Sequence, residues 1–138
     1  MLKDIDDNKD GTYILAIIDI DKFKEINDTY GHHRGDTCLV HFAKLLKEYG
    51  IGAIPYRYGG DEFCFLFFNK CIEEVKIICD QIRLKTKELI VNEEVRFTAS
   101  FGLAEYEVES GAAQLFVRAD QALYKAKIVR DSIEVHEG

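Results

Sequence analysis

Several features that mark whole classes of protein are missing from this sequence. It has no basic run and no arginine-rich stretch, and its formal net charge is -7, from 18 Lys and Arg against 25 Asp and Glu. A chain of this charge repels polyanions, so we expect no nucleic acid among its partners. No apolar run approaches the roughly 20 residues of a membrane span, and the acidic start does not fit a signal peptide. We expect a cytoplasmic domain without direct membrane contact; a membrane anchor in a longer full-length protein stays open.

The cysteines form no recognisable pairs. No two cysteines are spaced as C-x-x-C, and all four lie within apolar patterns, at Cys38, Cys64, Cys71 and Cys79. This distribution indicates reduced core thiols rather than a zinc site or a disulfide framework. No repeat, linker or low-complexity tract interrupts the chain, so residues 1–138 are expected to form one domain with a proper core.

Hydrophobic periodicity predicts alternating strands and helices. Runs of β-branched and aromatic residues predict strands at 12–20, 53–58, 62–68 and 94–106, with a short edge strand at 132–136. Amphipathic patterns predict helices at 21–31, 36–50, 71–89 and 114–127, with Asp21 capping the first. Gly59 and Gly60 separate the second and third strands and favour a tight hairpin turn. Gly102 marks a bulge or a close backbone approach.

This order of elements predicts an α+β fold. A split βαβ arrangement would give a mainly antiparallel sheet with helices packed on it. In such a sheet the first strand lies centrally beside the hairpin. The end of that strand would then bring Asp19 close to Asp61.

Acidic side chains gather at these strand ends. Asp19 and Asp21 close the first strand, and Asp61 and Glu62 open the third. Neighbouring carboxylates repel one another unless cations lie between them, and Mg²⁺ typically takes one or two protein carboxylates beside water and phosphate oxygens. The start of the following helix offers free N–H groups to phosphate, with Lys24 nearby. The alternative is that these acids are merely solvated, with Asp21 serving only as a cap.

Four segments carry a resemblance to a known family. "DIDKFKEINDTYGHHRGD", "RYGGDEF", "FTASFGLAEY" and "ADQALYKAK" resemble, in order, the motifs of the GGDEF family of diguanylate cyclases, from residue 12 to residue 130. The resemblance implies a palm-like sheet of the ferredoxin-like, nucleotidyl cyclase type. It also implies a nucleotidyltransferase that condenses two GTP into cyclic di-GMP and releases two pyrophosphates, by attack of a ribose 3'-hydroxyl on an α-phosphate.

The resemblance further implies a magnesium site at the acidic cluster. By motif position, Asp19, Asp61 and the backbone carbonyl of Ile20 correspond to the ligands of two Mg²⁺ per GTP site, with Mn²⁺ as an alternative. Asp61 and Glu62 correspond to the catalytic acids, and Glu62 is a candidate base for the 3'-hydroxyl. Gly59 and Gly60 correspond to the structural turn that aims Asp61.

Five further positions match the substrate-binding residues of the family. Asn27 and Asp36 correspond to the guanine readers, and a carboxylate suits the N1–H and amino group that guanine offers. Lys24 and Lys127 correspond to phosphate contacts, and Phe23 belongs to the same substrate site. Phe63, Phe65 and Phe67 are interpreted as core residues instead.

The reaction needs two copies of such a domain. Each GTP must aim its 3'-hydroxyl at the α-phosphorus of another, and two-fold pairing of domains gives that arrangement. A transient homodimer is therefore expected as part of catalysis.

The sequence departs from the family pattern in three places. Nothing matches the Asp-x-Leu-Thr segment that usually precedes the first strand, so we expect a piece cut from a longer sensor protein, weakly active or inactive in isolation. Gly50 and Ala53 occupy the Arg-x-x-Asp positions of the inhibitory product site, so no such site is expected. Arg130 stands one place early for a phosphate contact.

Two other functions stay open. One is a catalytically silent GTP-binding regulatory module of the same fold. The other is a palm-type cyclase or polymerase that uses another nucleotide.

Overall fold

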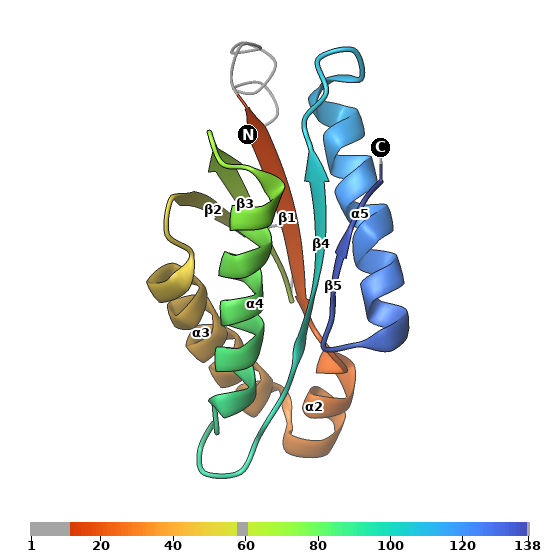
Figure 1. Ribbon diagram of the computed structural model, residues 1–138. Coiled ribbons are helices and arrows are strands. Elements are labelled where there is room, and N and C mark those ends of the chain that lie inside the picture. Colours follow the sequence, from red (N-terminus) through yellow and green to blue (C-terminus); the bar gives the residue numbers. More distant parts are fainter. Residues whose placement is uncertain (1–11, 58–60, 138) are drawn as a thin grey trace.

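The computed structural model describes residues 12–57 and 61–137, which form a mixed five-stranded sheet with helices on both faces (Figure 1). The strands are β1 (Tyr13–Ile20), β2 (Ala53–Arg57), β3 (Glu62–Phe68), β4 (Ala99–Glu105) and β5 (Ile133–Val135), in the spatial order β2-β3-β1-β4-β5. The helices are α2 (Phe23–Tyr30), α3 (His32–Tyr49), α4 (Ile72–Glu88) and α5 (Gly111–Val129). The predicted α+β fold with a mainly antiparallel sheet is confirmed; only β5 pairs in parallel, with β4.

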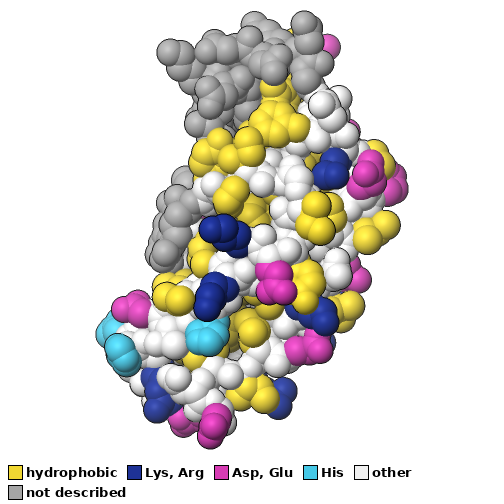
Figure 2. Space-filling model, turned by 90° about the vertical axis from the view of Figure 1, so that its left-hand side faces the viewer, with side chains coloured by type: hydrophobic (Ala, Val, Ile, Leu, Met, Phe, Trp, Pro, Cys, Tyr) yellow, Lys and Arg dark blue, Asp and Glu magenta, His cyan; other side chains and the backbone are white. Residues whose placement is uncertain are grey.

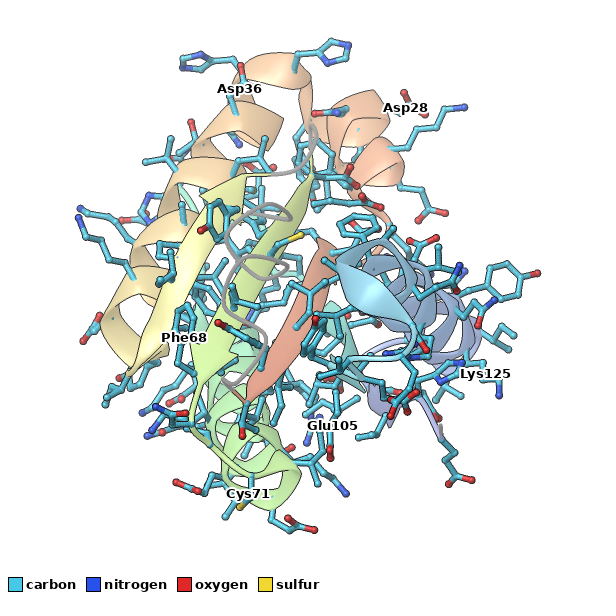
Figure 3. All side chains as sticks on the ribbon, turned by 90° about the horizontal axis from the view of Figure 1, so that it is seen from above. Asp28, Asp36, Phe68, Cys71, Glu105 and Lys125 are labelled. Carbon is cyan, nitrogen blue, oxygen red and sulfur yellow. The ribbon has the colours of Figure 1, made fainter. Side chains whose placement is uncertain are left out.

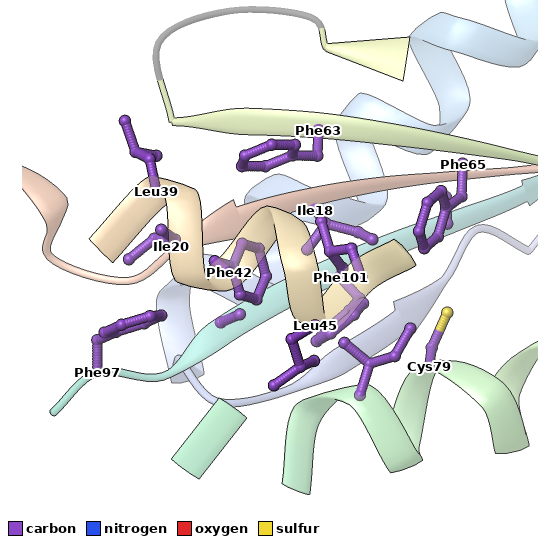
Figure 4. Packing of buried hydrophobic residues seen from close by; sticks show 14 of the residues in the cluster. Ile18, Ile20, Leu39, Phe42, Leu45, Phe63, Phe65, Cys79, Phe97 and Phe101 are labelled. Carbon is purple, nitrogen blue, oxygen red and sulfur yellow. The ribbon is translucent and has the colours of Figure 1, made fainter. Parts of the chain in front are cut away.

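β1 lies at the centre of the sheet because its side chains are apolar on both faces. Ile14, Ala16 and Ile18 belong to a core shared with α3 and α4, whereas Leu15 and Ile17 belong to a second core shared with α5. Figure 4 shows the first of these cores, where the rings predicted to be buried on β3 meet residues of α3 and α4. Helices on both faces explain why the β1 pattern is continuously apolar rather than alternating.

Close backbone contact joins α5 to the sheet at Gly102 of β4. A Cβ atom at Gly102 would lie 2.2 Å from the backbone nitrogen of Leu123 and 2.3 Å from the carbonyl oxygen of Ala119. The predicted close approach is therefore confirmed. It fixes the position of α5, which carries Lys127 to the acidic end of β1.

Three local predictions need correction. Helix α3 begins at His32, before the predicted residue 36, and Gly31 rather than Asp36 lies at its start. Lys22 occupies the N-cap of α2 in a left-handed conformation, so Asp21 does not cap that helix. Cys71 is exposed at the N-cap of α4, unlike the three buried cysteines. The predicted turn residues Gly59 and Gly60 lie outside the described residues.

The surface on the α3 side mixes side chains of all types. Figure 2 shows acidic, basic, histidine and apolar side chains interleaved there, without a large region of one kind. Across the described parts of the chain, no helix has both the length and the apolar character needed to cross a membrane.

Candidate active site

The antiparallel ladder of β1 and β3 brings acidic side chains together. Asp19 lies directly opposite Glu62 in the register of the two strands. Asp61 comes immediately before β3, and its side chain is hydrogen-bonded to that of Asp19. The expected proximity of Asp19 and Asp61 is thus present in the structure.

Asp19 is strongly perturbed by these surroundings. Its side chain is 14% exposed, and its Oδ1 atom is buried without a hydrogen-bond partner. Burial raises the pKa of Asp19 to about 8, helped by the hydrogen bond with Asp61 and by the negative charges of Asp61 and Glu62, while Lys127 opposes the rise. A carboxyl group of this kind retains a proton at neutral pH and gives it up when a cation binds.

Lys127 extends from α5 into the same site. Its Nζ atom lies 3.4 Å from Asp19 Oδ2, and it donates hydrogen bonds of 3.1 Å to the Ile20 carbonyl oxygen and 3.0 Å to Asp21 Oδ1. One ammonium group therefore contacts two carboxylates and the carbonyl of Ile20. It supplies positive charge that offsets the charge of these acids.

Asp21 is held by its own hydrogen-bond donors. Thr98 Oγ1 donates to Asp21 Oδ2 at 2.6 Å, Ser100 Oγ to Oδ1 at 2.7 Å, and the Asp131 backbone N–H to Oδ2 at 2.8 Å. Burial raises the pKa of Asp21, but these hydrogen bonds and the one from Lys127 outweigh burial and leave the pKa below its ordinary value. Asp21 therefore positions Lys127.

Glu62 is partly exposed at the start of β3. Burial raises its pKa, and the negative charges of Asp120 and Asp61 raise it further, against the effect of Lys127. Asp120 lies on α5, and no local signal in the sequence indicates that its charge acts on Glu62 of β3. A raised pKa makes Glu62 a stronger base than an ordinary glutamate.

The other predicted substrate residues lie on α2 and α3. Asn27 packs against Gly35, where a Cβ atom would lie 1.8 Å from Asn27 Oδ1 and 3.4 Å from Phe23 Cζ. Asn27 Oδ1 is buried and has no partner. Asp36 follows Gly35 and is exposed on α3, at the edge of the molecule in Figure 3. Lys24 is exposed on α2.

The donor set is compatible with magnesium. Asp19 and Asp61 bring two carboxylates together, and the Ile20 carbonyl oxygen lies within reach of the ammonium that also contacts Asp19. Within residues 12–57 and 61–137, no three His, Cys, Asp or Glu side chains form a group that could hold a metal ion by themselves. Mg²⁺ typically takes one or two protein carboxylates and fills the rest of its coordination shell with water or substrate oxygens. This site therefore fits Mg²⁺ better than it fits a metal whose ligands all come from the protein.

Comparisons with known sequences agree with the resemblance. A family model described as "Diguanylate cyclase, GGDEF domain" matches residues 2–131. The chain is 37% identical over 116 residues to diguanylate cyclase DgcM of Escherichia coli K12, covering 83% of this chain and 28% of DgcM. It is 36% identical over 124 residues to diguanylate cyclase A of Treponema denticola, covering 86% of this chain and 33% of that protein. The chain therefore spans a third or less of these relatives.

Solved structures show the same fold. The GGDEF domain of DgcB from Caulobacter crescentus, in complex with c-di-GMP, superposes with a TM-score of 0.89 at 28% identity and covers 99% of this chain and 84% of that one. The active GGEEF domain of a diguanylate cyclase from Vibrio cholerae gives a TM-score of 0.88 at 28% identity, covering 99% and 90%. The predicted palm-like, nucleotidyl cyclase type of sheet is thereby confirmed.

Proposed function

The chain belongs to the GGDEF domain family of the diguanylate cyclases, and from that premise we propose that it condenses two GTP molecules into cyclic di-GMP and releases two pyrophosphates. The observation that carries the proposal is the convergence of Asp19 and Asp61, with a buried and unpartnered carboxylate oxygen on Asp19. Such a group is costly to keep in a folded protein unless a ligand uses it.

Asp19, Asp61 and the carbonyl oxygen of Ile20 would hold magnesium. When bound, Mg²⁺ neutralises triphosphate charge and lowers the pKa of the attacking hydroxyl. Lys127 contacts this same carbonyl and the Asp19 carboxylate. We infer that Lys127 gives up these contacts when substrate binds and turns to the phosphates, where its charge supports the departure of pyrophosphate.

Glu62 is the proposed proton acceptor. It lies opposite Asp19 in the ladder, so it enters the site from the strand next to the metal-binding aspartate. Burial, Asp120 and Asp61 raise its pKa, which strengthens it as a base. Glu62 would take the proton of the 3'-hydroxyl while the oxygen attacks the α-phosphorus of the second nucleotide.

Asn27 and Asp36 are the proposed guanine readers. The buried Oδ1 of Asn27 is an acceptor without a donor, and the N–H groups of guanine would satisfy it. Asp36 would accept from the N1–H and amino group, which adenine cannot offer together. Phe23 lines this part of the site beside Gly35, and Lys24 lies nearby to meet phosphate.

A second copy of the domain completes the proposed site. Cyclic di-GMP joins two nucleotides, so each 3'-hydroxyl must attack the α-phosphorus of the other GTP, and a homodimer that forms transiently would bring two loaded sites together. An upstream sensor domain in the full-length protein would control how often this happens.

A silent GTP-binding regulatory module is the second candidate. The observation that favours it is Lys127, whose ammonium already satisfies the Ile20 carbonyl, Asp19 and Asp21. A chain that kept these contacts in the presence of nucleotide would bind GTP but not use magnesium.

Product analysis separates the candidates. The chain is incubated with GTP and Mg²⁺, or with ATP and Mg²⁺, and pyrophosphate and cyclic dinucleotides are measured by mass spectrometry, with Asp61→Asn as the control. We expect the wild type to make a cyclic dinucleotide, cyclic di-GMP, from GTP and none from ATP. The Asp61→Asn variant should make no cyclic dinucleotide from either nucleotide. GTP binding without product would favour the silent module, and a product from ATP would contradict the proposed guanine readers.

A further inference from the structure

The turn that follows α5 has an unusual backbone. Arg130, at the C-cap of α5, has φ 66° and ψ 159°, and Asp131 has φ 49°. Residues other than glycine seldom adopt positive φ, and the combination at Arg130 is almost restricted to glycine. Such a conformation persists only where the surrounding contacts hold it in place. The turn leads from α5 into β5 and begins three residues after Lys127, so the contacts that hold it also bear on the candidate active site (Figure 1).

Two cationic side chains on α4 hold the side chain of Asp131. Arg83 Nη1 lies 3.0 Å from Asp131 Oδ1, and Lys87 Nζ lies 2.9 Å from Asp131 Oδ2. The side chains of Arg83 and Asp131 are only 21% and 27% exposed, so water and salt screen this pair less than they screen an ordinary surface pair. Each carboxylate oxygen of Asp131 is therefore bound to α4.

The backbone of the same residue binds Asp21. The Asp131 N–H donates a hydrogen bond of 2.8 Å to Asp21 Oδ2, and Asp21 Oδ1 accepts one of 3.0 Å from Lys127. Asp21 is buried, so a donor that moves away is not simply replaced by bulk water. A shift of the turn would therefore disturb the carboxylate that holds the Lys127 ammonium.

These contacts form a continuous series from α4 to the acidic site. The series starts at Arg83 and Lys87 and continues through Asp131 and Asp21 to Lys127. The two helices that it connects pack on opposite faces of the sheet. We propose that Arg83 and Lys87 are positioning residues, which hold the Lys127 ammonium in the candidate active site by clamping the turn at Asp131. The inference rests on the proposed function only for what Lys127 does at the phosphates.

An ion pair that served stability alone would have a different effect. Its loss would lower the free energy of unfolding, but Lys127 in the folded protein would keep its contacts. Positioning predicts the opposite, because a loosened turn lets the ammonium occupy more positions, and ordering it on a ligand then takes more free energy. The test therefore measures Lys127 in the folded protein.

Two variants release the turn from α4, and we refer to them as the clamp variants. Asp131→Gly keeps the N–H that binds Asp21 and tolerates positive φ, so it removes the side-chain contacts without adding strain. The second is Arg83→Ala combined with Lys87→Ala, which leaves the turn sequence unchanged. Asp131→Asn is the conservative variant, since its amide oxygen still accepts from Arg83.

The same helix provides two control variants. Lys85→Ala breaks an ion pair of 3.4 Å with Glu88, one turn along α4, which does not involve Asp131. Asp80→Ala removes the other carboxylate that Arg83 contacts, at 2.9 Å, and leaves its pair with Asp131 in place. Both controls thus alter charge on α4 without releasing the turn.

Lysine labelling measures the position of Lys127 without any substrate. The folded proteins are treated briefly with acetic anhydride, and mass spectrometry compares the acetylation rate of Lys127 with that of Lys125, an exposed lysine on the same helix. Because Lys127 contacts Asp19, Asp21 and the Ile20 carbonyl, it should react slowly in the wild type. The clamp variants should raise its rate about fivefold or more, relative to Lys125.

The other variants decide between positioning and general loosening. Asp131→Asn should give an intermediate rate at Lys127, and both control variants should match the wild type within about twofold. An unchanged Lys127 rate in the clamp variants would overturn the proposal. So would an equal increase in the control variants, because any loss of charge on α4 would then have the same effect.

Nucleotide binding separates the clamp from the proposed function. Affinities for guanosine and for a GTP analogue that cannot be cyclised are measured in the presence of Mg²⁺. The clamp variants should lose about fivefold or more in affinity for the analogue and stay within about twofold for guanosine, since Lys127 is proposed to act on phosphate alone. Faster labelling of Lys127 with unchanged affinity for the analogue would support the clamp and contradict the proposed role of Lys127 at the phosphates.

Discussion

Asp19 and Glu62 face one another across the β1–β3 ladder. Like charges placed directly opposite on neighbouring strands destabilise a sheet, and Asp61 adds a third carboxyl group beside them. The structure limits the repulsion by burying Asp19 with a raised pKa and by bringing Lys127 to within 3.4 Å of it. The acidic cluster is therefore kept at a cost in stability, which is the usual condition of a functional site.

Replacement of Asp19 should stabilise the metal-free protein. Because folding raises the pKa of Asp19 to about 8, its contribution to stability is complete below its ordinary pKa of 3.8 and is lost as the pH rises through about 8. The free energy of unfolding should fall across this range by at most about 1.4 kcal/mol per pH unit. Asp19→Asn should remove this decline and abolish cyclase activity.

Urea denaturation at pH 5, 7 and 9 without Mg²⁺ measures this effect. The free energy of unfolding of Asp19→Asn should increase relative to that of the wild type as the pH rises. A difference between the two proteins that does not change with pH would rule out the raised pKa of Asp19.

Gly35→Ala should impair GTP binding more than it impairs folding. The added Cβ atom would lie 1.8 Å from Asn27 Oδ1, so Asn27 must move, whereas alanine itself favours the α3 helix. We expect GTP affinity to fall about tenfold or more with a small change in melting temperature. In an Asn27→Ala background the same substitution should cost little further affinity, and a double-mutant cycle checks this. Additive losses would mean that Gly35 does not act through Asn27.

An inhibitory product site cannot be restored by two substitutions. A Cβ atom at Gly50 would lie 2.6 Å from the Leu46 carbonyl oxygen and 2.6 Å from the Phe65 ring. Gly50→Arg combined with Ala53→Asp should therefore lower the free energy of unfolding by about 1–3 kcal/mol, without creating inhibition by cyclic di-GMP. Ala53→Asp alone is the control. Inhibition by cyclic di-GMP in a double variant as stable as the wild type would contradict this prediction. It would show that position 50, after α3, accepts a side chain without strain.

The hydroxyl of Ser100 should stabilise the protein in a pH-dependent way. Folding lowers the pKa of Asp21, so its hydrogen bonds contribute above the ordinary pKa and are lost as the pH falls below it. Ser100→Ala should cost about 1–3 kcal/mol at pH 7 and less near pH 3. Thr86→Val removes a buried hydroxyl that bonds only the Ile82 carbonyl among the interactions described, so its cost should not change with pH. Chemical denaturation at both pH values measures the stability that Ser100→Ala and Thr86→Val each lose. The same pH dependence for the two variants would argue that the Ser100 hydroxyl does not act through the Asp21 carboxylate.

Local patterns predicted most of the fold. The continuous apolar run of β1, the amphipathic repeats of the helices and Gly102 each carry their signal within a few residues. Asp21 was misread as a cap because the donors that hold it, Thr98 and Ser100, are 77 and 79 residues away in the chain. No periodicity reveals such a partner.

In the candidate site, local patterns predicted the proximity of Asp19 and Asp61, whereas the roles of the site residues stay predictions. Topology placed Asp19 near Asp61, since the end of β1 lies beside the start of β3 in an antiparallel pair. The contacts of Lys127 with Asp21 and the Ile20 carbonyl depend on how α5 packs across the sheet. Gly35 gave no signal, because its role is to leave room for Asn27.

The most direct measurement concerns the cation site itself. Electron paramagnetic resonance follows Mn²⁺ binding in the presence of a GTP analogue that cannot be cyclised, for the wild type, Asp19→Asn and Asp61→Asn. The account predicts that the wild type binds Mn²⁺ together with the nucleotide and that both variants lose at least about tenfold in metal affinity. Unchanged Mn²⁺ binding in both variants would contradict the central claim that these two aspartates hold the metal.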